Sequence, residues 1–210
     1  MSVVTTIDDV TAWVRENICP KVRLKVPPET ENDPMDEEAA AAYQLVQPAA
    51  FALYVPTSEK LPPGVISRVP SICVRVIEGE DDVKMREGTI RLQLAFSTYD
   101  PGTHGKDIFR PDDEKPGEVR QWQGPDADAF FRRNGDGWRD AWNMVDVSLA
   151  EIERAPTIGG LRLDMSQPVA FGPLKDQEGI PDFYPFWFAW VEFSLIRKLM
   201  RHTGEYDNLL

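Results

Sequence analysis

Two cysteines and two histidines are the side chains best suited to nucleophilic or metal chemistry in this sequence. Cys19 and Cys73 lie too far apart along the chain to form a CxxC metal or redox pair, and free cysteines are most often small buried hydrophobes. A cysteine–histidine nucleophile pair would need His104 or His202 beside a thiol, and zinc bound through histidine alone would need more histidines. We therefore expect no catalytic residue, no metal site and no cofactor.

Carboxylates are abundant, and two of them held at a fixed distance in a pocket can act as general acid and general base. The acidic runs are Asp81-Asp82, Asp112-Asp113-Glu114, Asp126 and Asp128. Acidic runs in loops are usually solvated surface, so they do not by themselves predict a reaction. They leave one alternative open: a small intracellular α+β enzyme or ligand-binding domain that uses carboxylates of the Asp100–Asp128 loop.

Two glycine-containing segments match known binding loops only in part. Gly102–Asp107 has a glycine–lysine step, but its spacing is shorter than that of a phosphate-binding loop and an aspartate follows the lysine. Asn134–Gly137 is similar to the start of a calcium loop but lacks a glutamate at the required position. Both segments predict turns, and the second predicts the N-cap of a helix.

Glu192 is unusual because it lies within an otherwise apolar strand. An unpaired charge buried there would be strongly destabilising. We expect it to pair with an arginine such as Arg91, with a position at an interface or sheet edge as the alternative.

Trp122 lies beside Arg120 in a long loop rich in proline, glycine, aspartate and arginine. An exposed aromatic residue next to arginine is typical of a protein–protein hot spot, although Trp122 folded back onto the domain is an equal alternative. The candidate subunit interface comprises Asp107, Phe109, Arg110, Arg120 and Trp122.

The chain has 210 residues and a formal net charge of −12. This acidity argues against a broad phosphate-gripping face and against docking on anionic membrane. Two cysteines argue against a disulfide scaffold, and no apolar run approaches the length of a membrane helix. The N-terminal residues lack the pattern of a signal peptide. These features predict a soluble intracellular protein.

The hydrophobic pattern predicts two main helices and several strands. A first helix is expected from a Thr6 cap to Ile18, before Pro20, and a second from about Asp136 to Arg154. The expected strands are Lys21–Val26, Phe51–Val55, Ser71–Ile77, Gly88–Tyr99, Leu161–Met165, Val169–Phe171 and Phe186–Ile196, with Glu78–Gly88 as a hairpin connection. The expected fold is α+β: a mostly antiparallel sheet with two helices packed on it. We expect one domain over residues 1–210, with long insertions at 27–46 and 100–135.

From Gly88 onward, the order of elements resembles the tail terminator and tail-completion proteins of long-tailed bacteriophages and prophages. The resemblance rests on a strand such as Ile90–Phe96, a long loop, an amphipathic helix such as Trp138–Ile152, and two closing strand regions at Leu161–Phe171 and Phe186–Ile196. With the N-terminal helix it covers most of residues 5–200. The extra material at 27–46 and 100–135 departs from the family pattern and leaves another connector or minor tail role open.

The resemblance implies a structural protein of the virion tail, present in the host cytoplasm during assembly, with no catalysis. Such proteins form homo-oligomeric rings, usually of six subunits, that cap the tail tube, and their partners are tail-tube and head-completion proteins. DNA passes through the ring without sequence-specific binding. The net charge of −12 is compatible with that passage because an acidic channel repels phosphates.

Overall fold

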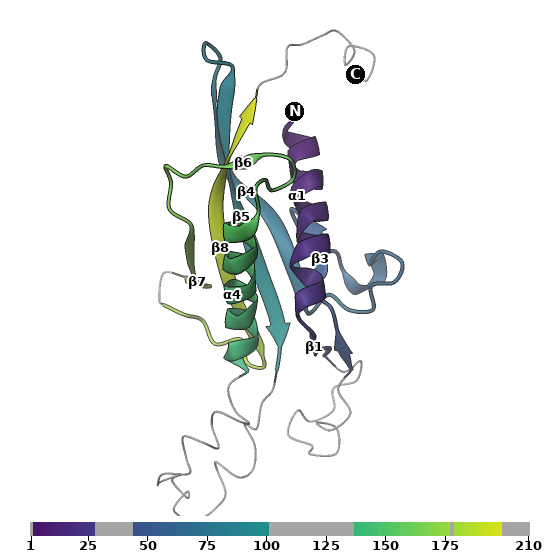
Figure 1. The fold of residues 1–210 in the computed structure, drawn as a ribbon. Helices are drawn as coiled ribbons and strands as arrows, with labels where there is room; N and C mark the ends of the chain where they lie inside the picture. Colours follow the sequence, from purple (N-terminus) through teal and green to yellow (C-terminus); the bar gives the residue numbers. More distant parts are fainter. Residues whose placement is uncertain (1, 28–43, 101–136, 177–178, 199–210) are drawn as a thin grey trace, which may run out of the picture.

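The computed structural model describes residues 2–27, 44–100, 137–176 and 179–198 (Figure 1). Its main feature is a six-stranded sheet in the order β3-β4-β5-β8-β6, with β7 also paired to β8. The strands are β3 (Ala49–Ala52), β4 (Ser71–Asp82), β5 (Glu87–Tyr99), β6 (Arg162–Leu163), β7 (Ala170–Pro173) and β8 (Phe186–Lys198). All pairs are antiparallel except β3 with β4, which are parallel.

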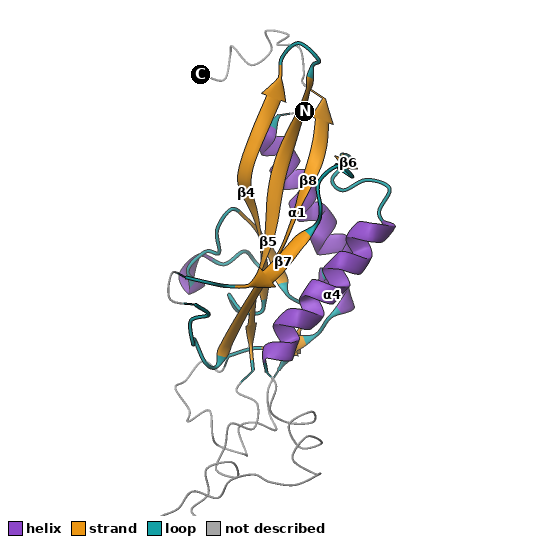
Figure 2. Cartoon of the chain, turned by 90° about the vertical axis from the view of Figure 1, so that its left-hand side faces the viewer, coloured by secondary structure: helices purple, strands orange, loops and turns teal. Residues whose placement is uncertain are grey.

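Both long helices, α1 (Val3–Asn17) and α4 (Trp138–Arg154), cover the same face of this sheet (Figures 1 and 2). Helix α1 contacts β3 and β4, whereas α4 contacts β5 and β8. Two 3₁₀ helices, η1 (Cys19–Lys21) and η2 (Ser58–Lys60), and a small pair of strands, β1 (Leu24–Lys25) and β2 (Leu45–Val46), complete the described elements. The predicted α+β fold with a mostly antiparallel sheet is confirmed.

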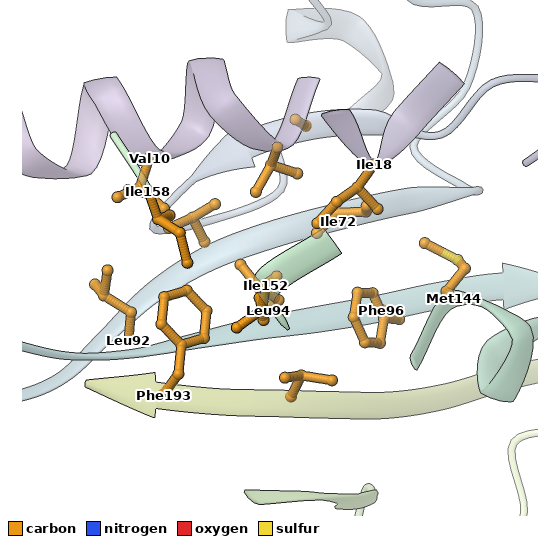
Figure 3. Packing of buried hydrophobic residues seen from close by; sticks show 14 of the residues in the cluster. Val10, Ile18, Ile72, Leu92, Leu94, Phe96, Met144, Ile152, Ile158 and Phe193 are labelled. Atoms are coloured by element: carbon orange, nitrogen blue, oxygen red, sulfur yellow. The ribbon is translucent and has the colours of Figure 1, made fainter. Parts of the chain in front are cut away.

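The hydrophobic core lies between the helices and the central strands, where every second residue of β5 from Gly88 to Thr98 is buried. Its Leu92, Leu94 and Phe96 side chains are buried on the helix-covered face, and β8 supplies their antiparallel neighbours Phe193, Val191 and Ala189. Residues of α1 and α4, with the α1 C-cap residue Ile18, close this layer, as Figure 3 shows for Val10, Ile18, Met144 and Ile152.

Helix α1 begins one turn earlier than the sequence pattern predicts. Its N-cap is Ser2, whose hydroxyl accepts a hydrogen bond of 3.1 Å from the Thr5 N–H. The expected cap, Thr6, is instead fully buried within the first turns, where its hydroxyl donates to the Ser2 carbonyl. A threonine inside the helix can thus be fully buried because its hydroxyl finds a hydrogen-bond partner within the same helix.

Helix α4 follows the prediction more closely, with Gly137 as its N-cap residue. The residues that it buries are Ala141, Met144, Val145, Ser148 and Ile152. Trp138 in the first turn is 42% exposed, because it lines a pocket that opens beside the helix.

Further boundaries predicted from the sequence differ from the structure. The predicted strand Lys21–Val26 is reduced to Leu24–Lys25, because Pro20 lies within the 3₁₀ turn η1. The predicted strand Phe51–Val55 lies earlier, at Ala49–Ala52, because Leu53 adopts a φ of 65° that ends the strand. The predicted connection Glu78–Gly88 is mostly strand, and ion pairs from Glu78 to Arg91 and from Asp81 to Arg197 offset its acidity.

Candidate interaction site

A pocket of about 580 Å³ lies between the first turns of α4, the start of β8 and the connection that precedes β8. Its walls are mainly aromatic. Three tryptophans contribute, Trp138, Trp142 and Trp187, together with phenylalanines from the segment 183–188. The volume falls within the range of about 300–1,000 Å³ that is common for ligand pockets.

Edge-to-face aromatic contacts build the walls of this pocket. Phe183 lies 5.5 Å from Phe188 between ring centroids, and Tyr184 lies 6.4 Å from Trp187, both nearly perpendicular. Such geometry is the preferred arrangement of aromatic quadrupoles. These contacts connect the segment before β8 to β8 itself.

The neighbouring strand β7 is held to β8 by a tryptophan. The Trp190 indole N–H donates to the Pro173 carbonyl at 2.9 Å. Its ring also covers Gly172, where a Cβ atom would lie 3.1 Å from the indole. Glycine at this position therefore lets β7 approach β8 closely, and Pro173 and Leu174 then continue into the pocket wall.

The rim of the pocket exposes large apolar side chains to solvent. Ile180 is 67% exposed, Phe183 is 49% exposed and Leu174 is 39% exposed, and all three line the pocket together with Trp138. Scattered apolar residues on a surface are ordinary, but their gathering around one hollow is typical of an interaction surface. We refer to Trp138, Leu174, Ile180 and Phe183 as the apolar rim.

The two ends of the segment 101–136 meet beside this pocket. The Trp187 indole N–H donates to the Asp100 carbonyl at 2.9 Å, and the Asp100 N–H donates to the Pro185 carbonyl at 3.1 Å. Gly137 packs so tightly that a Cβ atom there would lie 2.4 Å from the Asp100 carbonyl oxygen. The chain thus leaves and re-enters the described fold next to the apolar rim.

Charged groups surround this junction. Lys25 Nζ lies 2.5 Å from Asp100 Oδ1 in an ion pair that joins β1 to the end of β5. Burial, together with the negative charge of Asp100, raises the pKa of the nearby Asp140 carboxyl to about 6, against a smaller opposing effect of Lys25. A carboxyl that is partly protonated near neutral pH therefore lies in the first turn of α4, at the base of the junction.

The predicted interface residues Asp107, Phe109, Arg110, Arg120 and Trp122 lie outside the described residues. His104, His202 and the carboxylates at 112–114, 126 and 128 also lie outside them. The structure shows where the segment 101–136, which contains the five predicted interface residues, is attached to the fold. The pocket itself was not predicted, although the dense aromatic run from Phe183 to Trp190 was a signal for it.

Three other sequence-based expectations have an outcome. Cys19 and Cys73 are buried free thiols, as expected, and burial raises the pKa of both. Glu192 is buried and forms the predicted ion pair with Arg91. The largely apolar sequence of Phe186–Ile196 predicts a strand covered on both faces; β8 is buried on both faces over Val191–Leu195, whereas Phe188 and Trp190 are only partly buried.

Within the described ranges, no group of three or more histidine, cysteine, aspartate or glutamate side chains is arranged to hold a metal ion. None of the described helices is both long and apolar enough to cross a membrane. No protein-family model matches this chain, and the comparison with curated proteins gives no match.

Proposed function

We propose that this protein is a structural subunit of a phage or prophage tail, a tail terminator or head–tail connector that forms a homo-oligomeric ring on the tail tube. The observation that carries the proposal is the apolar rim at the root of the segment 101–136. Burial of these exposed aromatic and aliphatic side chains in an interface would remove apolar surface from water, which favours association. The sequence-predicted interface residues belong to the segment that leaves the fold at this point.

The proposal assigns the apolar rim and the attached segment to one intersubunit surface, with tail-tube and head-completion proteins as further partners. The excess of acidic residues suits a ring through which DNA passes without binding. Subunit association then depends on apolar burial and not on a charge attraction between identical acidic chains.

The test is the native mass of the purified protein across a concentration series, with and without magnesium. Ile180→Glu should weaken assembly by placing a charge in the apolar rim. Val4→Glu on α1 is the matched control, because Val4 and Ile180 are both 67% exposed. Trp122→Ala should impair assembly while leaving the unfolding transition of the monomer nearly unchanged. A species that stays monomeric even with isolated tail tubes, or equal effects of the two glutamate variants, would contradict the proposal.

The pocket favours a second candidate, a ligand-binding domain. Its volume of about 580 Å³ and its aromatic lining suit a small apolar or aromatic molecule. Thermal stabilisation by such a molecule in the wild-type protein, lost in Trp142→Ala, would favour this function. An unchanged melting temperature across a broad ligand library would argue against it.

A further inference from the structure

Strand β4 is much longer than the strand that pairs with its outer edge. β3 pairs only with Ser71–Val74, whereas β5 pairs with β4 along its other edge as far as Asp82. The stretch Arg75–Asp82 therefore has no partner strand on its outer side among the described strands. It forms one arm of a hairpin that extends past the ends of α1 and α4 (Figures 1 and 2).

A specific backbone feature ends the pairing. The Leu53 N–H donates to the Val74 carbonyl at 2.8 Å, and this is the last backbone hydrogen bond that β4 receives from the β3 side within the described residues. Leu53 then adopts a φ of 65°, and the Tyr54 N–H turns back to the Ala52 carbonyl. A left-handed conformation is uncommon for leucine, so β3 stops because the chain bends sharply away at this residue.

The backbone direction along the open stretch follows from that hydrogen bond. Because the Val74 carbonyl faces β3, alternation directs the backbone groups of Val76 to the same side. The register shift between Val76 and Glu78 moves the alternation by one residue. The N–H and C=O groups of Gly79 and Asp81 therefore point outward, which leaves an edge able to accept another strand.

Beyond the register shift, the side chains along this edge are acidic on one face, whereas Arg75, before the shift, is exposed on that same face. Glu78, Glu80 and Asp82 are exposed at alternate positions and lie on the face of the sheet away from the helices. Arg91 pairs with Glu78 at 3.2 Å and with Glu192, and the Asp82 carboxylate accepts the N–H groups of Lys84 and Met85. Glu80 has no ion pair within the described part of the chain.

We propose that the outer edge of β4, from Arg75 to Asp82, binds an extended segment of a partner protein that carries lysine or arginine at every second position. Such a segment adds a strand to the sheet, with backbone hydrogen bonds to Gly79 and Asp81. Its basic side chains lie opposite Glu78, Glu80 and Asp82, where cross-strand pairs of opposite charge are stabilising. The same acidic stripe disfavours pairing with a second copy of this edge, because like charges would be brought together.

This inference does not depend on the proposed ring, because it concerns a different partner and a different surface. The probe is a fluorescent peptide long enough to span Arg75–Asp82, in which lysine alternates with valine, with a matched peptide that carries glutamate in place of lysine. Binding to the full-length protein is measured by fluorescence anisotropy at low and moderate salt. Hydrogen exchange of the Gly79 and Asp81 amides reports where the peptide lies.

Gly79→Pro removes an outward N–H without removing a hydrogen bond between β4 and β5, and Gly79→Ala is its matched control. A Cβ at Gly79 would come no closer than 3.4 Å to a neighbouring atom, so alanine is accommodated. Proline should weaken lysine-peptide binding at least tenfold relative to alanine. Glu80→Lys should also weaken it severalfold, and Glu153→Lys on the exposed side of α4 should not.

The expected result is salt-sensitive binding of the lysine peptide, slower exchange of the Gly79 and Asp81 amides, and no binding of the glutamate peptide. Equal binding to the proline and alanine variants would overturn the inference, as would equal binding of both peptides. A dimer that Gly79→Pro dissociates would also overturn it, because the edge would then pair with a second copy. If Gly79→Pro does not fold, the Glu80→Lys and Glu153→Lys pair decides the outcome.

Discussion

The Asp140 carboxyl gives a quantitative test of the charged junction beside the pocket. Its pKa rises from an ordinary value of 3.8 to about 6, chiefly because it is buried and secondarily because Asp100 is nearby. The folded state therefore binds this proton more tightly than the unfolded state does. By linkage, the contribution of Asp140 to stability is most favourable below about pH 4 and is lost as the pH rises through about 6.

The magnitude follows from this difference. The rise of the pKa from 3.8 to about 6 corresponds to about 3 kcal/mol as a ceiling, because each tenfold change in proton affinity is worth about 1.4 kcal/mol. Asp140 is only partly buried, so solvent screening reduces the penalty to roughly half of that. The helix dipole also stabilises the charged form of Asp140 in the first turn of α4 by about 0.5 kcal/mol, which lowers the penalty further. We therefore expect Asp140→Asn to stabilise the protein by about 1 kcal/mol at neutral pH.

The assay is urea unfolding of the wild type, Asp140→Asn and Asp146→Asn at several pH values between 4 and 8. Asp146 is the matched control because it is exposed on the same helix. The stability gained by Asp140→Asn should grow from near zero at pH 4 to its full value above pH 6, whereas Asp146→Asn should show no such trend. A gain that does not depend on pH, or a loss of stability at neutral pH, would refute the assignment of a buried, proton-binding carboxyl.

Three further predictions follow from packing. Phe193→Ala, at a fully buried core position, should reduce the free energy of unfolding by about 3–5 kcal/mol in urea titrations, whereas Phe171→Ala, at a half-exposed edge position, should cost distinctly less. Gly137→Ala should destabilise the fold by roughly 1–3 kcal/mol in the same assay, because its Cβ would lie 2.4 Å from the Asp100 carbonyl oxygen. Cys19 should react with Ellman's reagent at pH 8 only after unfolding, because burial raises its pKa to about 11, and rapid reaction of the native protein would contradict this.

The long elements could be predicted because their own patterns carry the information. Every second residue of β5 from Gly88 to Thr98 is buried, so one buried side determines both the strand and its register. Helix α4 likewise presents a continuous apolar stripe. The Arg91–Glu192 ion pair was also predictable, since a charge within an apolar strand needs a partner.

The short elements depend on contacts that the local sequence does not contain. β1 and β2 are two residues each, and β6 exists only because Arg162 and Leu163 lie beside Ile196 and Leu195. The end of β3 is fixed by the positive φ of Leu53, a backbone conformation that the presence of a leucine does not predict. The pocket shares this dependence, because its walls come from α4 and from the segment before β8, which only the folded sheet brings together.

The two proposed surfaces lie at opposite ends of the same strands. β5 runs from Glu87 at the hairpin to Tyr99 beside the pocket, and β8 runs back from Phe186 to Lys198. The Arg75 end of the β4 edge pairs with Gln93 and its Asp82 end pairs with Glu87, six and twelve residues from Tyr99. At about 3.4 Å per residue, the edge therefore lies roughly 20–40 Å along the strands from the pocket. A charge placed in the apolar rim is therefore farther from the β4 edge than the screening length of physiological salt, about 8 Å, so it should have little effect on binding at that edge.

Because of this separation, the two surfaces can be tested independently. Ile180→Glu should leave binding of the lysine peptide unchanged, and Gly79→Pro should leave self-assembly unchanged. Two unlike surfaces on one chain also mean that association through the apolar rim leaves the β4 edge of every subunit available to a different protein. If either variant abolishes both activities, the surfaces are not independent and both assignments must be revised.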